Sequence, residues 1–245
     1  MQLSDYTPED VRRGVEDAYD VIVAGKFTVD NPIAYILGGQ GGAGKSTLHQ
    51  LFTEVNQGTI VIINGDEYRR YHPRYKAICV QYGNEAANYT QSFANVIAAT
   101  LVEKLSDEGY NLVIEGTCRR ADVPLKTCGD LKEKGYFCEL SVMCTSAEVS
   151  WQSTIDRYIE MANTAGMIPR AVPRDKFEET VKALPDNIET LFKSGKFDEI
   201  TLFNRDRKCL YRMTETPKTS PYNIVYDNLH PDDLVPILEL ANKKG

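Results

Sequence analysis

The feature that most constrains this chain is the run Gly39-Gln40-Gly41-Gly42-Ala43-Gly44-Lys45-Ser46, which matches G-x-x-x-x-G-K-[ST] at every position. Glycines allow backbone conformations in which successive N–H groups point inward at phosphate oxygens. The run stands between the apolar segment Ile33–Leu37 and a helix expected over residues 45–54, which is the context that the pattern requires. We therefore predict a phosphate-binding loop, or P-loop, that holds a nucleotide.

Each part of this loop has an expected role. Lys45 should reach the β- and γ-phosphates of the nucleotide, and the Ser46 hydroxyl should bind Mg²⁺. The helix that follows presents its positive N-terminus to the same anion. The predicted nucleotide-binding residues are Gly39, Gln40, Gly41, Gly42, Ala43, Gly44, Lys45, Ser46 and Thr47.

Short apolar runs alternate with helical patterns along most of the chain. Strands are expected over residues 33–37, 59–63, 112–114 and 137–143, with a hairpin over 200–203 and 209–211. Helices are expected over 7–23, 45–54, 85–104, 122–134, 146–161 and 174–192, loops over 163–173 and 214–221, and a last helix from about 232. This order predicts an α/β fold of the P-loop NTPase class: a mostly parallel sheet, helices on both faces, and a C-terminal strand and helix extension. We expect one domain over residues 1–245.

The charge pattern argues against several classes of partner. The formal net charge is −7, from 35 acidic and 28 basic side chains, and no block of Lys or Arg stands out. Neither a nucleic acid nor an anionic membrane is therefore expected as the main partner. The polar, acidic segment Met1–Asp10 does not have the pattern of a signal peptide, and no apolar run is long enough to cross a bilayer.

The cysteines bear on the compartment in which the chain works. The six cysteines form no C-x-x-C pair, and only three histidines could share a metal with them. Buried free thiols in a reducing compartment explain these spacings better than a zinc site or a set of disulfides. We therefore expect a cytoplasmic protein. The cysteines are Cys79, Cys118, Cys128, Cys138, Cys144 and Cys209.

Two other classes of P-loop protein lack their signatures here. A signalling GTPase needs D-x-x-G and N-K-x-D, but the sequence has no D-x-x-G, and its one Asn-Lys pair, Asn242-Lys243, lacks the Asp. A mechanical ATPase usually has a hydrophobic run that ends in Asp-Glu, which is also missing. Instead, single acids follow two predicted strands, in Asn64-Gly65-Asp66 and in Glu115-Gly116-Thr117.

Asp66 and Glu115 lie at strand ends that should face the P-loop, where ligands gather in open α/β sheets. An acid there can take the proton from an attacking hydroxyl, as a kinase requires. Asp66 is the better candidate because Arg69, three residues later, could orient it or bind phosphate. Glu115 and Thr117 suit recognition of an acceptor or support of Mg²⁺. The alternative is that Asp66 only caps a helix beginning at Glu67.

Phosphoryl transfer also needs cations against the charge of the moving group, and small-molecule kinases often supply them from a mobile lid. Arg157 lies on the helix before the loop at 163–173, and Arg170 lies inside that loop. Both are candidates for this role. On position alone, however, a solvated surface arginine is the more common case.

Several longer strings resemble the zeta toxin family. The likeness runs from the P-loop strand to about Pro221, nearly the whole chain. The string Gly-Tyr-Asn-Leu-Val-Ile-Glu-Gly-Thr at residues 109–117 is far more specific than the P-loop itself. The other matching segments are Ile62–Arg69, His72-Pro73-Arg74-Tyr75, Arg157-Tyr158, Arg170-Ala171-Val172-Pro173 and Glu215-Thr216-Pro217.

The resemblance implies a kinase of bacterial toxin–antitoxin systems. Such a kinase would use ATP or GTP to phosphorylate the 3′-hydroxyl of UDP-N-acetylglucosamine, a cell-wall precursor, and a small helical antitoxin would cover its nucleotide site. By this likeness Asp66 would be the general base, and Lys45, Arg157 and Arg170 would act on the phosphates. The residues expected to bind the acceptor are Asp66, Arg69, Glu115, Thr117 and Arg119.

Two positions depart from the family pattern. Ala99 stands where members carry a glutamate that helps to hold the sugar, and leaving a hydroxyl unpaired costs about 1–3 kcal/mol. Glu103, one turn later, could compensate. Asn64 stands where some members carry an acid. The departures keep open a second hypothesis, the same chemistry on another nucleotide sugar or a nucleoside.

A third hypothesis is of another class: a nucleotide-gated binding module whose output is a partner interaction. It predicts nucleotide binding without phosphorylation of any acceptor. The arginine pair and the missing switch motifs count against it.

Overall fold

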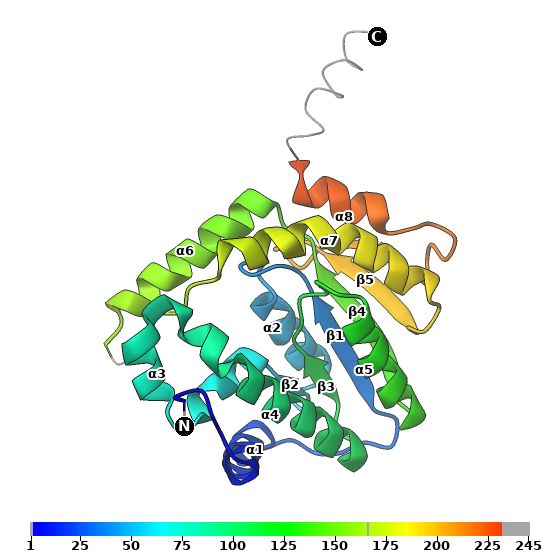
Figure 1. Cartoon of the computed structure of the whole chain (residues 1–245). Helices are drawn as coiled ribbons and strands as arrows, with labels where there is room; N and C mark the ends of the chain where they lie inside the picture. Colours follow the sequence, from blue (N-terminus) through cyan, green and yellow to red (C-terminus); the bar gives the residue numbers. More distant parts are fainter. Residues whose placement is uncertain (1, 166, 232–245) are drawn as a thin grey trace, which may run out of the picture.

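The computed structural model describes residues 2–165 and 167–231. At its centre lies a six-stranded sheet with the strand order β2-β3-β1-β4-β5-β6 (Figure 1). Neighbouring strands run parallel except β5 and β6, which form an antiparallel hairpin. The predicted fold class is therefore confirmed. The strands are β1 Ile33–Gly38, β2 Val61–Ile63, β3 Leu112–Ile114, β4 Phe137–Met143, β5 Glu199–Phe203 and β6 Cys209–Arg212.

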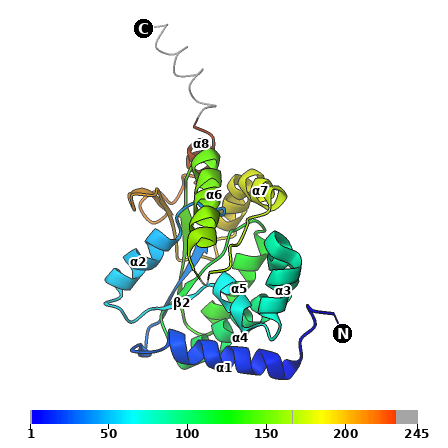
Figure 2. The same cartoon turned by 90° about the vertical axis from the view of Figure 1, so that its left-hand side faces the viewer.

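Helices cover both faces of this sheet. Figure 2 shows α2 on one side and α4, α5 and α7 on the other. Helix α1 begins where the sequence predicts, because Thr7 and Asp10 form a capping box around Pro8. The helices are α1 Pro8–Ile22, α2 Ser46–Val55, α3 Tyr75–Tyr82, α4 Ala86–Glu108, α5 Asp122–Glu133, α6 Ala147–Asn163, α7 Arg174–Lys193 and α8 Tyr222–Leu229, with short 3₁₀ helices η1 Gly65–Tyr71 and η2 Gly83–Glu85.

Strand β1 positions the P-loop, because it lies between β3 and β4 in the middle of the sheet. Every residue of β1 after the first is buried, as expected of a strand covered on both faces. Ala34 and Ile36 pack into the core that α4, α5 and α7 cover. Tyr35 and Leu37 pack on the opposite face, in a second core with helix α2. The P-loop therefore leaves the sheet from a central strand that is buried on both faces.

The structure differs from the sequence prediction in several local elements. The pattern does not predict α3 or α8, and the helix considered from Glu67 begins two residues earlier, as η1. Helix α3 buries only Ile78 and so lacks an apolar stripe. Strand β2 is shorter than expected, because both the N–H and the hydroxyl of Thr59 bond the carbonyl of Asn56. The helix predicted from about 232, and Gly166 of the predicted loop, lie outside the described residues.

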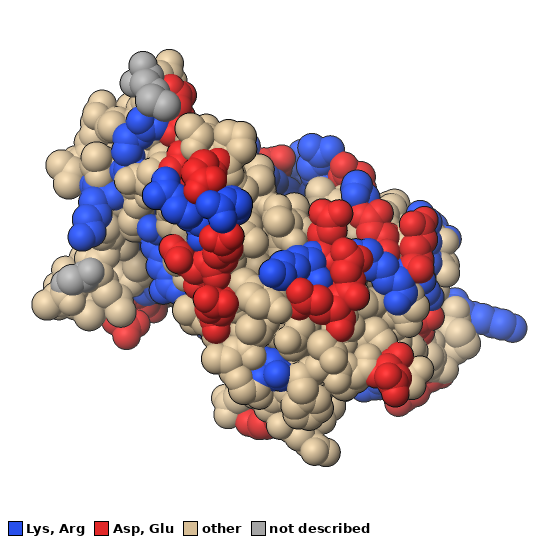
Figure 3. Space-filling model, turned by 90° about the horizontal axis from the view of Figure 1, so that it is seen from below, with Lys and Arg blue, Asp and Glu red and all other residues tan. Residues whose placement is uncertain are grey.

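The surface carries charges of both signs. Figure 3 shows Lys and Arg interspersed with Asp and Glu on the face seen from below. On α1, for example, Arg12 pairs with both Glu9 and Glu16. None of the helices in the described part of the chain combines the length and the apolarity that a membrane crossing needs.

Most cysteine side chains lie inside the fold. Cys118, Cys128, Cys138 and Cys144 are buried, and all four belong to the larger core. They act there as small apolar residues. The prediction of buried thiols is correct for these four, whereas one of the other two is half-buried and one is exposed.

Candidate active site

The P-loop connects the end of β1 to the start of α2. Gly39, Gly42 and Gly44 have φ values of 127°, 74° and 98°, in a region that other residues rarely adopt. Helix α2 begins at Ser46, and no side chain of the described residues caps its N-terminus. The N–H groups of Thr47 and Leu48 already bond the carbonyls of Gly44 and Lys45, whereas the N–H of Ser46 has no hydrogen bond within the described residues and is available to an anion.

Side chains around the loop hold it in this shape. Gln40 is fully buried, and its Nε2 donates hydrogen bonds to the carbonyl of Thr145 at 2.7 Å and to Ser150 Oγ at 2.8 Å. Thr47 Oγ1 donates to the carbonyl of Gly44 at 2.9 Å. Ser46, by contrast, is exposed, and its hydroxyl has no hydrogen bond within the described residues. Gln40 and Thr47 thus shape the loop, and the Ser46 hydroxyl is free for a ligand.

Gly42 packs directly against α6. A Cβ atom at Gly42 would lie 2.0 Å from the carbonyl oxygen of Ser150, so the loop or the helix would have to move. We expect Gly42→Ala to lower the thermal unfolding temperature and to weaken ATP binding by about tenfold or more. Gly25→Ala is the matched control, because Gly25 has a similar φ of 72° and no atom within 4 Å of the added Cβ. Equal losses in the two variants would contradict the role of this packing.

Lys45 lies inside the loop. Its Nζ donates hydrogen bonds to the carbonyls of Gly39 at 2.9 Å and Gln40 at 3.1 Å, and the residue is only 8% exposed. Burial lowers the pKa of Lys45 below its ordinary value, and the carboxylates of Glu115 and Asp66 oppose this effect. The strand ends thus bring both predicted acids within electrostatic reach of the loop lysine.

Asp66 follows β2 at the start of η1. The side chain of Asn64 caps that helix, because its Oδ1 accepts a hydrogen bond from the backbone N–H of Asp66 at 3.0 Å. The alternative in which Asp66 only caps a helix is therefore wrong, and Asn64 has a structural role. The Asp66 carboxylate instead accepts hydrogen bonds from Arg69 Nε at 3.0 Å and Nη2 at 2.8 Å. The Asp66 side chain remains 54% exposed.

Electrostatics keep Asp66 ionised. Burial acts to raise the pKa of Asp66, but the charge and hydrogen bonds of Arg69, with the charges of Arg170 and Arg157, outweigh it and lower the pKa below its ordinary value. Asp66 is therefore a carboxylate at neutral pH, oriented by Arg69 and accessible from solvent. Ionisation, orientation and access from solvent suit a proton acceptor, while the lowered pKa makes this carboxylate a weaker base.

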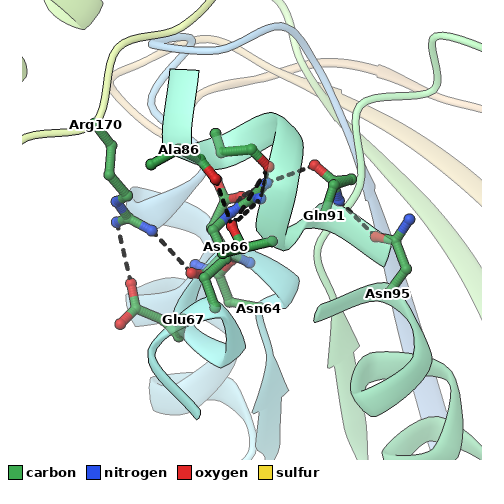
Figure 4. Close-up of polar contacts among 10 residues, drawn as sticks. Asn64, Asp66, Glu67, Ala86, Gln91, Asn95 and Arg170 are labelled. Carbon is green, nitrogen blue, oxygen red and sulfur yellow. Dashed lines mark hydrogen bonds and ion pairs between the residues drawn. The ribbon is translucent and has the colours of Figure 1, made fainter. Parts of the chain in front are cut away.

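Arg69 connects Asp66 to helix α4. The arginine is buried, and it donates hydrogen bonds to the carbonyl of Ala87 at 2.6 Å and to Gln91 Oε1 at 2.5 Å. Gln91 Nε2 then donates to Asn95 Oδ1 at 2.6 Å. Figure 4 shows this chain of polar groups beside Asp66. The network fixes the orientation of the Asp66 carboxylate, and it extends from Arg69 to the side-chain amides of Gln91 and Asn95.

Arg170 comes from the loop between α6 and α7 and reaches the Asp66 segment (Figure 4). Its Nη1 donates a hydrogen bond to the backbone carbonyl of Asp66 at 2.9 Å, and its Nη2 lies 3.4 Å from Glu67 Oε1. Arg157 is exposed on α6 and has no hydrogen bond or ion pair within the described residues, yet its charge acts on Lys45 and Asp66. Arg157 is thus an unpaired cation close to the P-loop.

Glu115 follows β3 and faces helix α2. Its Oε2 lies 3.3 Å from His49 Nε2. Burial acts to raise the pKa of Glu115, but His49 and Lys45 outweigh it and lower the pKa below its ordinary value. The carbonyl of Thr117 accepts a hydrogen bond from the N–H of Gly39 at 3.3 Å, which links this segment to the P-loop. Arg119 turns towards α7, where its Nε lies 3.9 Å from the Glu179 carboxylate.

Ala99, which departs from the family pattern, and Glu103, which could compensate for it, both lie on α4. Ala99 and Glu103 are both exposed. The backbone carbonyl of Glu103 accepts a hydrogen bond from Lys134, towards the end of α4. The α4 side chains that bond Arg69 belong to the first turns of the helix, to Thr90 and Gln91. Compensation for Ala99 by Glu103 remains a prediction.

Three residues beside the site were not predicted: His49, Gln91 and Arg205. His49 stands four residues after Lys45, so helical spacing alone could have placed it on the same side of α2. Arg205, in the turn after β5, lies over the P-loop: its Nε would be 3.3 Å from a Cβ on Gly44. Nothing in the sequence near Gln91 or Arg205 indicates a role at the site. The packing of α4 and the order of the strands bring these two residues there.

Comparison with known proteins agrees with these features. A sequence model of the zeta toxin family matches residues 19–216. Toxin PezT of Streptococcus pneumoniae is 40% identical over 215 residues, which cover 88% of this chain and 85% of PezT. Toxin zeta of Streptococcus pyogenes is 34% identical over 246 residues, covering 99% of this chain and 86% of that protein.

Solved structures give the same relationship. A structure from the PezAT chromosomal toxin–antitoxin system of Streptococcus pneumoniae matches with a TM-score of 0.83 and 37% identity, over 94% of this chain and 90% of that one. The AvrRxo1-ORF1:-ORF2 complex, at 13% identity and a TM-score of 0.65 over 96% of this chain and 76% of that one, shares the fold alone. The region matched by the family model, residues 19–216, spans the P-loop and both strand-end acids. The chain therefore belongs to the zeta toxin family of P-loop kinases.

Proposed function

We propose that this chain transfers the γ-phosphate of ATP or GTP to a sugar hydroxyl of a nucleotide sugar, with UDP-N-acetylglucosamine and its 3′-hydroxyl as the leading acceptor. The observation that carries the proposal is Asp66: an ionised, exposed carboxylate, oriented by Arg69 and within electrostatic reach of Lys45. A nucleotide switch has no need of such a base. A kinase does.

Each residue has a distinct part in the proposed reaction. Asp66 accepts the proton of the acceptor hydroxyl. As it does so, the hydroxyl oxygen forms a bond to the γ-phosphorus, and the bond from that phosphorus to the leaving nucleoside diphosphate breaks. Lys45, Arg157 and Arg170 counter the charge that spreads over the transferred group. Asp66 keeps its orientation throughout because Arg69 holds the carboxylate through two hydrogen bonds.

The residues present also fit Mg²⁺, a hard cation that prefers oxygen ligands. The Ser46 hydroxyl is exposed at the start of α2, and Glu115 and Asp66 supply carboxylates near Lys45. Ser46 would hold the ion, with Glu115 in support. When bound, the ion neutralises phosphate charge.

The choice of acceptor rests on the family resemblance and on residues around Asp66. Glu115 and Thr117 stand at the positions expected to bind the sugar nucleotide. The Ala99 side chain cannot accept a hydrogen bond. The amides of Gln91 and Asn95, by contrast, are linked to Arg69, which itself bonds Asp66. An acceptor that offers a carbonyl or phosphate oxygen to an amide N–H would suit this surface. Another nucleotide sugar or a nucleoside is therefore the second candidate.

The partner we propose is a small helical antitoxin that covers the nucleotide site. One solved relative comes from a system described as a toxin–antitoxin pair, which supports this proposal. The cytoplasm is the compartment in which we expect the reaction, because nucleotides are available there and the buried thiols remain reduced.

Mass spectrometry of the reaction products tests the function. The purified chain, incubated with ATP, Mg²⁺ and UDP-N-acetylglucosamine, should yield an acceptor that is heavier by one phosphoryl group. A parallel incubation with a small-molecule cell extract identifies a different acceptor if the first reaction gives none. Nucleotide binding without any phosphorylated product in either reaction would refute the kinase proposal in favour of a binding module.

A further inference from the structure

The turn between β5 and β6 is a preformed structure beside the P-loop. The Oδ1 atom of Asn204 accepts hydrogen bonds from the backbone N–H groups of Asp206 at 3.1 Å and Lys208 at 2.9 Å. Arg207 takes the left-handed conformation, with φ 61°, and its Nη1 lies 3.5 Å from Glu54 Oε2 on α2. The Asn204 side chain therefore closes the turn, and the ion pair between Arg207 and Glu54 attaches the turn to α2, the helix that begins at the P-loop.

Arg205 projects from this turn over the P-loop. Its Nε would lie 3.3 Å from a Cβ on Gly44, and its Nη1 donates a hydrogen bond to Ser153 Oγ on α6 at 3.0 Å. The residue is exposed, and no carboxylate pairs with it within the described residues. The planar, positively charged guanidinium of Arg205 therefore lies at the edge of the P-loop, where its hydrogen bond to Ser153 of α6 holds it in place.

Arg205 and Asp66 flank the P-loop from opposite sides. Asp66 follows β2 at one edge of the sheet, Arg205 follows β5 near the other edge, and β1 with the P-loop lies between them (Figure 1). In the proposed reaction the γ-phosphate must lie towards Asp66. The ribose and base of the nucleotide then leave the loop on the side of Arg205.

We propose that Arg205 binds the nucleoside end of ATP or GTP by stacking its guanidinium plane on the purine base. Guanidinium groups stack on aromatic faces, and the bond to Ser153 holds this one in place before the nucleotide arrives. The proposal rests on the proposed kinase function for the direction of the triphosphate. It assigns a role in nucleotide binding rather than in proton transfer.

Equilibrium binding of ATP, measured by calorimetry without any acceptor, tests this assignment. Arg205→Ala should weaken ATP binding by about tenfold. Arg205→Lys keeps the positive charge but loses the planar guanidinium. The affinity of this variant for ATP should therefore stay close to that of the alanine variant. Lys208→Ala is the matched control, because it removes an exposed cation from the same turn and should bind ATP like the unchanged chain.

Steady-state kinetics provide a second readout. For Arg205→Ala the KM for ATP should rise, while kcat and the KM for the acceptor stay within about twofold. Unchanged ATP affinity in Arg205→Ala, in a variant with an unchanged thermal unfolding temperature, would overturn the proposal. Recovery of affinity by lysine would overturn the stacking. The proposed function fails separately, if ATP binds but no acceptor is phosphorylated, and that result leaves the role of Arg205 standing.

Discussion

Asp66→Asn should lower kcat by about 10²–10⁴-fold while ATP binding stays within a few fold. The amide keeps the size of the side chain and can still accept the hydrogen bonds of Arg69, so the geometry of η1 is preserved. What the amide cannot do is take the proton of the acceptor hydroxyl. Product formation with ATP and UDP-N-acetylglucosamine, followed by mass spectrometry, measures the loss.

Glu67→Gln is the matched control for this prediction. It makes the same change from carboxylate to amide at the neighbouring position of η1. Within the described residues the Glu67 carboxylate pairs with Arg170 alone, at 3.4 Å. Its rate should stay within a few fold of the unchanged chain. A rate for Asp66→Asn close to that of this control would remove Asp66 as the base.

Lys45→Met should lower kcat by about 10²–10³-fold and also weaken ATP binding, because a cation that opposes phosphate charge is lost. The fold should survive. Burial already disfavours the charged ammonium of Lys45, and methionine has a similar length and an apolar chain suited to a site that is only 8% exposed. Thermal unfolding, calorimetry with ATP and the product assay together separate these effects.

Lys134→Met is the matched control, because Lys134, like Lys45, donates a hydrogen bond to a backbone carbonyl. Lys134 Nζ donates to the carbonyl of Glu103 at 3.2 Å, far along α4 from the P-loop. This variant should keep both ATP affinity and rate. If Lys45→Met retained a rate within tenfold of the unchanged chain, Lys45 would not be the cation that serves the transferred phosphate.

The sequence by itself determined the P-loop, the α/β class and the strand-end position of Asp66. These features depend on residues close together in the chain. The glycines allow the loop conformation, the apolar runs form buried strands, and Arg69 reaches Asp66 from three residues away. Helix α3 escaped prediction because it buries a single side chain and so has no apolar period.

Only the tertiary structure decided what surrounds Asp66 and the P-loop. Gln91 supports Arg69 because α4 packs on η1, and Arg205 meets Gly44 because β5 lies beside β4 in the sheet. In the sequence Asn64 is a departure from a family pattern, and in the structure its side chain caps η1. Local backbone preference acts over a few residues. Contacts between distant side chains follow from the order of strands and the packing of helices, which no single segment of the chain encodes.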